Sequence, residues 1–585
     1  MTGHEDIRTG ALDPITAEVI MHGLNAIPNL VDKNIARTAY SFLIAEYKDY
    51  AVGIVDSEGK LITQSRGGLP IFVANALSAA VEDGLAIYGR RTLQHGDVVI
   101  SNHAGSMGQH LNNVVMYTPI RTGEADDELV GFFAVVMHWM DVGGITIGSC
   151  QSPFTTDIFQ EGIQFRTVKL LARGERVEEM FRMVAENTRF PKLVLGDLES
   201  QIAGCIAGRD MALELVTLWG AANIRAAVEH FWSRAEAATR AVIAEIPDGE
   251  YFARSFLDDD GVEKGKPVEI AVKVVVRGDE AVIDLSGVAA QLKGPLNSGY
   301  QGGAVAASRM AAKYVFSPDG PANYGAFKPI HVVCPPGRFL SAGPTAPIGG
   351  SGFAIPTVVD TIMRALAACL PTRIPAAHHG TYSVHVIDGH TEDGELFQHI
   401  ESAAGGWGAS HDRDGGGPFR SMAHGDTLEV PVELQESSHP YIIEYVRLRT
   451  NSGGAGRHRG GLGLEKAYRV KVPCRLTTSI ERTACPPWGL DGGQPGVTGR
   501  VEVLHTDGRS ETLLKGESRL AAGDRVLLFT AGGGGFGDPK TRDPDEIAHD
   551  VELGYVCAEQ AQAMYGYQSQ AMTITGGAAR AATME

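Results

Sequence analysis

Residues 135–149, VVMHWMDVGGITIGS, constrain the fold most, because a strongly apolar run ends here in ionisable side chains. Burying His138 and Asp141 costs free energy unless they are paired, hydrogen-bonded or bound to an ion. Residues three apart on a strand point to opposite faces, so the two can converge only if the strand ends between them. Gly143 and Gly144 permit such a turn, because glycine adopts positive φ freely. The segment therefore predicts either a buried His–Asp pair or part of a metal site.

A second polar group lies in the loop SNHAGSMGQHLNN (101–113), between two apolar segments that predict strands. It carries His103 and His110, and rigid flanking strands make such a loop a good platform for ligands. Asp49, which opens the strand-like segment DYAVGIV, is a further candidate. Imidazole and carboxylate without thiolate suit Zn²⁺, Mn²⁺ or Fe²⁺. By spacing alone, His110 could equally be an ordinary loop histidine.

Length and composition indicate a globular protein of several domains. A chain of 585 residues exceeds one ordinary core, so roughly two to four domains are expected. The formal net charge of −19 argues against nucleic acid or an anionic membrane as a partner. The N-terminus has no signal-peptide layout, and no apolar run reaches the roughly 18 residues of a membrane helix. Seven scattered cysteines without a CxxC pair indicate reduced thiols and a cytoplasmic location.

The order of patterns predicts a mixed α/β (α+β) multi-domain fold. Helix-forming residues dominate 13–41 and 195–246, short strands follow from about 249, and the last third is rich in glycine and strands. We expect an N-terminal metal-binding domain over 1–246 and a central α/β domain over 247–470. A β-rich segment with a final helical pair is expected over 471–567, and a disordered tail over 568–585.

Several longer motifs carry a family resemblance. RTAYSFLIAEYKDYAVGIVDSEGKLITQ, SNHAGSMGQHLNN, MHWMDVGGITIGS, GDLESQIAG and TAGGGGFGDPKTRDPDEIAHDVELGYV resemble the B subunit of the ATP-dependent hydantoinase/oxoprolinase family. The resemblance covers about residues 12–567. Members include N-methylhydantoinase, 5-oxoprolinase, caprolactamase, and the acetone and acetophenone carboxylases. It implies a metal-bearing B part that acts on substrate activated by an ATP-binding A-type partner, in a heterotetramer.

The resemblance also implies a ligand set. The aspartate of the family's RDFS motif falls on Asp49, the histidine of GGTHLPD on His110, and the first histidine and the aspartate of HHxDIGG on His138 and Asp141. These four residues are the predicted ligands of a divalent metal, Zn or Mn and less readily Fe. His138 is also predicted to take part in catalysis.

This sequence departs from the family pattern near those ligands. Asn113 replaces an acidic residue, Trp139 replaces the second histidine of HHxDIGG, and Phe72 stands where many relatives have a histidine. The NDPY segment has become NHAG, which introduces His103 either as an extra metal ligand or as a catalytic proton shuttle, and we predict the catalytic role. The loss of a carboxylate at 113 leaves ligand number and metal identity open.

Three functions follow as hypotheses. The first is the metal-binding B-type subunit of an ATP-dependent cyclic amide hydrolase, which opens hydantoin, oxoproline or lactam rings. The second is a subunit of a ketone carboxylase that uses bicarbonate, and the third is a non-catalytic subunit with a structural metal. The chain has no Walker A loop, since GVEKGKP lacks the Ser/Thr, so ATP and Mg²⁺ are expected on the partner.

Two glycine-rich segments each allow two interpretations. GGGGFG (532–537) matches GxGxxG after an apolar segment, but the prolines of DPKTRDP make a poor helix start, so a glycine turn is favoured over dinucleotide binding. Residues 452–463, SGGAGRHRGGLG, could hold an anion or form a tight basic hairpin.

Overall fold

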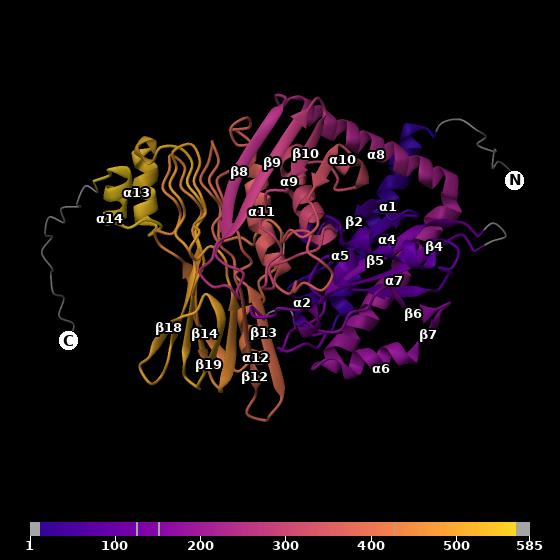
Figure 1. Ribbon diagram of the computed structural model, residues 1–585, viewed down its shortest axis with the longest axis horizontal. Helices are drawn as coiled ribbons and strands as arrows, with labels where there is room; N and C mark the ends of the chain where they lie inside the picture. The colour runs from indigo at the N-terminus through magenta and orange to yellow at the C-terminus, as the bar shows by residue number, and fades with distance from the viewer. Residues whose placement is uncertain (1–11, 124–126, 150–151, 426, 569–585) are drawn as a thin grey trace, which may run out of the picture.

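The computed structural model describes residues 12–123, 127–149, 152–425 and 427–568. Within these residues it is a mixed α/β protein of several domains with four main sheets (Figure 1), which confirms the predicted fold class. The predicted disordered tail, apart from Gln568, lies outside the described residues.

The N-terminal half is built on a seven-stranded antiparallel sheet in the order β2-β1-β5-β4-β3-β6-β7. Its central strands are buried on both faces, which explains why they read as continuous apolar runs rather than as an alternation. The strands are β1 (Tyr50–Asp56), β2 (Leu61–Gln64), β3 (Val98–Ser101), β4 (Asn113–Arg121), β5 (Leu129–His138), β6 (Val168–Ala172) and β7 (Glu175–Arg176).

Helices cover both faces of this sheet. One face packs on α1 (Pro14–Thr38) and α7 (Pro191–Trp219), with α8 (Ala221–Ala244) beside α1. The Asp13 side chain caps α1 by accepting from the backbone N–H groups of Ile15 and Thr16. The opposite face packs on α4 (Ala76–Tyr88) and shares one hydrophobic core with α9 (Ala306–Phe316) and α11 (Ser351–Ala365). The shorter helices are α2 (Phe42–Ala45), α3 (Pro70–Val73), α5 (Ala104–Met107), α6 (Glu178–Glu186), α10 (Tyr324–Phe327) and α12 (Val432–Ser438).

A second, four-stranded sheet in the order β11-β10-β9-β8 packs on the far side of α11. It contains β8 (Gly249–Leu257), β9 (Val268–Arg277), β10 (Glu280–Asp284) and β11 (Ile330–Val333). The end of α8 coincides with the boundary predicted near 246. The core is nevertheless continuous across it, because Leu77 of α4 and Val272 of β9 belong to the same buried cluster.

The C-terminal half forms two further sheets that share a core. The first, in the order β13-β12-β16-β19, contains β12 (Val384–His390), β13 (Leu396–Ser402), β16 (Cys474–Ser479) and β19 (Lys515–Leu520). The second, in the order β14-β15-β20-β17-β18, contains β14 (Tyr441–Leu448), β15 (Leu464–Val470), β17 (Arg500–Leu504), β18 (Ser510–Thr512) and β20 (Arg525–Phe529). Pairing of β12 with β16 and of β15 with β20 runs across residue 470, where the sequence predicted a boundary. The helices α13 (Pro544–Glu552) and α14 (Ala558–Gln560) follow.

The glycine-rich segments stack side by side as extended chains beside α13 (Figure 1). Gly533 N–H donates to the carbonyl of Gly461, and Gly461 N–H donates to that of Trp407, at 2.9 and 2.8 Å. A Cβ on Gly533 would lie 2.0 Å from the Trp407 carbonyl oxygen, so only glycine permits this spacing. Close backbone packing therefore accounts for the glycine content of both segments, since 453–461 and 532–537 belong to one stack.

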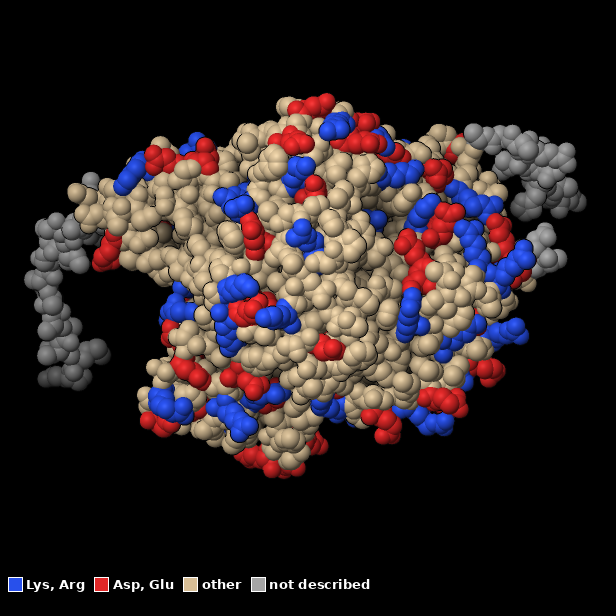
Figure 2. Space-filling view, in the orientation of Figure 1, with Lys and Arg blue, Asp and Glu red and all other residues tan. Residues whose placement is uncertain are grey.

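Surface and helix hydropathy add two observations. On the face in Figure 2, cationic and anionic side chains are interspersed. Within the described ranges, Pro70–Tyr88 has the length and composition of a membrane-crossing helix, and the α7–α8 pair does so only if its 103° bend is ignored. Since 67% of the Pro70–Tyr88 window is buried inside the protein, a core helix accounts for this composition.

Candidate functional site

Strand register gathers three predicted polar residues at one end of the seven-stranded sheet. In β5, Met137 pairs with Tyr50 of β1, and His138 pairs with Asn113 of β4. Asp49 directly precedes β1, and its carbonyl accepts from the His138 backbone N–H at 3.0 Å. Direct neighbours on adjacent strands point to the same face. Asp49, His138 and Asn113 therefore all line one pocket on the face that carries α4.

His110 reaches the same pocket from the loop before β4. Its ring lies edge-on to the His138 ring, with 5.1 Å between centroids. Within the part of the chain that the structure describes, neither ring nitrogen of His110 meets a partner with hydrogen-bond geometry, although the nearby Asn113 side chain interacts favourably with its charged form. Buried polar atoms are usually paired, so these nitrogens require an explanation.

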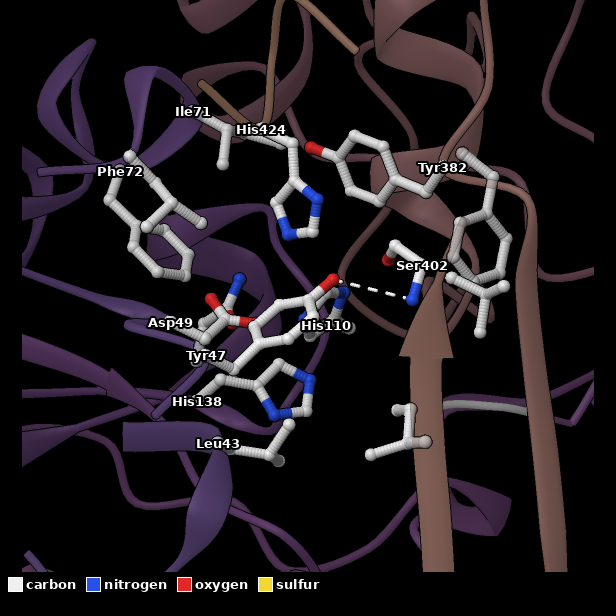
Figure 3. Close-up of a pocket in the computed structure, with 15 residues that line it drawn as sticks. Leu43, Tyr47, Asp49, Ile71, Phe72, His110, His138, Tyr382, Ser402 and His424 are labelled. Carbon is white, nitrogen blue, oxygen red and sulfur yellow. Dashed lines mark hydrogen bonds between the residues drawn. The ribbon is translucent and has the colours of Figure 1, made fainter. Parts of the chain in front are cut away.

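The opposite wall comes from the C-terminal half of the chain (Figure 3). The ring of His424 stacks on Tyr382 at 4.5 Å and 14° and points toward Asp49 and His110. The Ser402 backbone N–H donates to the hydroxyl of Tyr47 at 3.3 Å. The rest of the lining is apolar and comprises Leu43, Leu69, Ile71, Phe72, Phe353, Val384 and Ile400.

Burial sets the protonation of the pocket. It raises the pKa of Asp49 to about 7, opposed by the Arg420 guanidinium, and lowers the pKa of His110 to about 4. Burial also holds the pKa values of His138 and His424 well below their ordinary range. The three histidines are therefore neutral near pH 7, the state in which an imidazole can bind a metal or accept a proton.

Asp141, the fourth predicted ligand, is not brought to this pocket. Its Oδ1 accepts from Arg189 Nη1 at 2.8 Å and from Ser149 Oγ at 3.0 Å, and its Oδ2 accepts from the Arg189 backbone N–H at 2.7 Å. The Asp141 carboxylate instead braces the loop after β5, since its Oδ1 also accepts from the Gly148 backbone N–H at 3.2 Å. The expected convergence of His138 and Asp141 does not occur.

His103 and Trp139 also lie away from the pocket. The Nδ1 atom of His103 accepts from the Ser106 backbone N–H at 3.2 Å, which caps the short helix α5. Trp139 points to the opposite face of the sheet, where its indole N–H donates to Gln201 Oε1 at 3.2 Å. The replacement of the family's second histidine by Trp139 therefore leaves the pocket lining unchanged.

A second group of potential ligands lies behind the pocket wall. Single ligand atoms of His385, His399 and Glu401 lie within 4.8 Å of one another. The Lys466 ammonium, however, lies 2.8 and 3.0 Å from the two carboxylate oxygens of Glu401. Tyr468 donates to the same carboxylate at 2.7 Å. A cation there would face Lys466, so a buried ion pair explains this group better than a metal does.

Sequence reasoning missed the pocket's C-terminal wall. His424 lies in the segment SMAHG, which has no periodicity and matches no ligand motif. Tyr382 lies two residues after HHG (378–380), whose histidines the sequence favours as structural hydrogen-bonding groups over active-site residues. Only the contact between the two halves of the chain reveals these residues.

Known proteins share this architecture. The putative D-/L-hydantoinase B subunit of Pseudomonas sp. (strain NS671) is 28% identical over 584 residues, with 96% of each chain covered. The ATP-dependent caprolactamase of Pseudomonas jessenii superposes with a TM-score of 0.87 at 25% identity, over 96% of this chain and 97% of that one. An acetone carboxylase structure gives 0.86 at 20% identity, over 95% and 79%, and shares the fold. The Hydantoinase B/oxoprolinase family model matches residues 13–539, and the chain therefore belongs to that family.

Proposed function

We propose that this chain is the metal-bearing, catalytic B-type subunit of an ATP-dependent cyclic amide hydrolase. One observation carries the proposal. Asp49, His110 and His138 converge in a largely apolar pocket, where neither ring nitrogen of His110 has a partner with hydrogen-bond geometry among the described residues. Such a buried donor set is expected to bind an ion or a reacting molecule.

The residues fit a divalent metal. Two neutral imidazoles and one carboxylate suit Zn²⁺ or Mn²⁺, and the Asn113 amide oxygen, which also has no hydrogen-bond partner, offers a further ligand. An ion held by Asp49, His110 and His138 would polarise a carbonyl group and lower the pKa of water. Asp141 is left out of this set because Arg189 neutralises it.

Proton transfer falls to His424 in this proposal. Its neutral ring is fixed against Tyr382 and faces the proposed ligands from the other wall. A neutral imidazole can accept the proton of an attacking water and return it to the leaving nitrogen. The apolar side chains around it exclude bulk water, which strengthens each polar contact inside.

A partner is part of the proposal. The chain lacks a nucleotide-binding loop, and a relative that matches it over nearly its whole length is named as one of the subunits of a hydantoinase. We infer that an A-type partner holds ATP and Mg²⁺ and activates the substrate, in a heterotetramer. Use of ATP and six free cysteines among the described residues fit a cytoplasmic site of action.

The test compares two histidines of the same segment. His110→Ala should remove bound metal, measured by elemental analysis, and abolish substrate-dependent phosphate release with the A-type partner. His103→Ala is the matched control, because that side chain caps α5 outside the pocket. Full metal content and turnover in His110→Ala would refute the proposal. Full turnover with lower thermal stability in His138→Ala would instead favour a structural metal.

A ketone carboxylase is the second candidate. The pocket is small and mostly apolar, which also suits a small ketone. Labelled bicarbonate in the product would establish carboxylation, whereas ring opening without label would establish hydrolysis.

A further inference from the structure

We propose that the pocket selects an uncharged substrate with an apolar carbon skeleton and rejects a ring that carries a carboxylate. This inference rests on the proposed function, because it assigns the substrate class of the same site. Three observations support the inference: the charged residues of the pocket lining, the volume of the cavity and the position of Arg420.

Cationic side chains do not line the described pocket. Fifteen residues line it, and none is Lys or Arg. Its acidic member is Asp49, and its other polar members are three histidines, Asn113, Ser402 and two tyrosines. A substrate carboxylate placed against the apolar wall would therefore meet no counter-charge, and a carboxylate at the proposed ligands would take the place of the reacting carbonyl.

The Arg420 side chain does not line the pocket, although its charge favours the ionised form of Asp49. The Arg420 guanidinium lies over the Tyr47 ring at 5.0 Å, and Tyr47 rather than Arg420 lines the pocket. Its Nη2 donates to the Leu428 carbonyl at 3.1 Å and lies 3.4 Å from Glu429. Its Nη1 has no hydrogen-bond partner among the described residues, and the guanidinium packs on the Tyr47 ring outside the pocket lining.

Bound water cannot solvate a substrate carboxylate in place of a Lys or Arg side chain. The cavity volume is about 40 Å³, and a single water needs about 10–15 Å³. The pocket therefore holds only a few waters, which the substrate itself would displace. The apolar wall includes Ile71 and Phe72, which face the same space as Asp49 and His424 (Figure 3), and it matches a hydrocarbon skeleton.

Two substrates with the same ring provide the test: 2-pyrrolidinone is neutral, and 5-oxoproline adds one carboxylate to it. Caprolactam, and acetone with bicarbonate, are two further neutral substrates. With the complete complex and ATP, we expect the best of the three neutral substrates to have a kcat/KM at least tenfold higher than that of 5-oxoproline. Equal or better use of 5-oxoproline would overturn this inference and leave the proposed function standing. Failure of every cyclic amide and ketone to support turnover would overturn the proposed function and this inference with it.

A matched pair of variants tests the charge argument directly. Ile71→Lys places an ammonium in the apolar wall, and Ile71→Met provides a neutral side chain of similar length. Relative to the Met variant, the Lys variant should raise the ratio of 5-oxoproline to 2-pyrrolidinone turnover at least tenfold. An unchanged ratio would contradict the inference if the Lys and Met variants have the same melting temperature. If the Lys variant fails to fold, the wild-type substrate ratio decides alone.

Discussion

The buried group around Glu401 provides a prediction that separates an ion pair from a second metal site. Lys466 and Glu401 are 1% and 2% exposed, and the ammonium lies 2.8 Å from the nearer carboxylate oxygen. Lys466→Met removes the cation and leaves the carboxylate buried without a counter-charge. Breaking a buried pair in this way costs about 3–5 kcal/mol. Urea unfolding followed by circular dichroism measures the loss.

The double variant Lys466→Met/Glu401→Gln is the control. Replacing both charges leaves no uncompensated ion, so it should recover most of the stability lost in the single variant. A double-mutant cycle of Lys466→Met, Glu401→Gln and the double variant should give a coupling free energy of about 2 kcal/mol or more between the two side chains. Coupling near zero would refute the ion-pair interpretation.

The pH dependence of the single variant gives a second readout. Burial favours a protonated Glu401, but Lys466 and the neighbouring histidines hold its pKa well below the ordinary value. In the wild type this carboxylate therefore adds stability above its unfolded-state pKa. Without Lys466 its pKa rises above that value, so the deficit of the variant should grow from pH 5 to pH 8. Metal bound at His385 and His399 in the variant would favour a metal site instead.

Three further predictions follow from single contacts. Gly533→Ala should lower the free energy of unfolding by about 1–3 kcal/mol or more, because its Cβ would overlap the Trp407 backbone. Gly343→Ala, whose Cβ would lie in ordinary contact 3.6 Å from Gln291 Oε1, should change it by less than about 1 kcal/mol in denaturant titrations. Burial raises the pKa of Glu161 from 4.5 to about 7, so the unfolded chain loses this proton first as the pH rises. Stability should fall by up to about 3 kcal/mol between those values, and Glu161→Gln should flatten the profile. Trp139→His should cost about 3 kcal/mol in thermal or urea unfolding without adding a metal ligand, because position 139 faces away from the pocket, and an increase in bound metal would contradict this orientation.

Local sequence patterns predict secondary-structure elements and part of the candidate site. The apolar run before His138 predicts a buried strand, and the helix-forming residues of 13–41 predict α1. Asp49, His110 and His138 were selected as ligand candidates from their positions beside strands and from the family resemblance. The structure brings these three together, and their role as metal ligands stays a prediction.

Long-range contacts decided the rest. The placement of the Asp141 carboxylate depends on Arg189, which binds it from 48 residues away. The strand pairs that join residues on both sides of 470 and the glycine stack at Gly533 depend on segments that meet only in the folded chain.

Sequence by itself determined which residues can be buried, which segments can form strands or helices, and to which family the chain belongs. Tertiary structure alone decided that His424 and Tyr382 complete the pocket and that Asp141 and His103 do not enter it. The physical reason is that side-chain periodicity fixes the face of a strand, whereas the neighbour across that face is chosen by packing between distant segments.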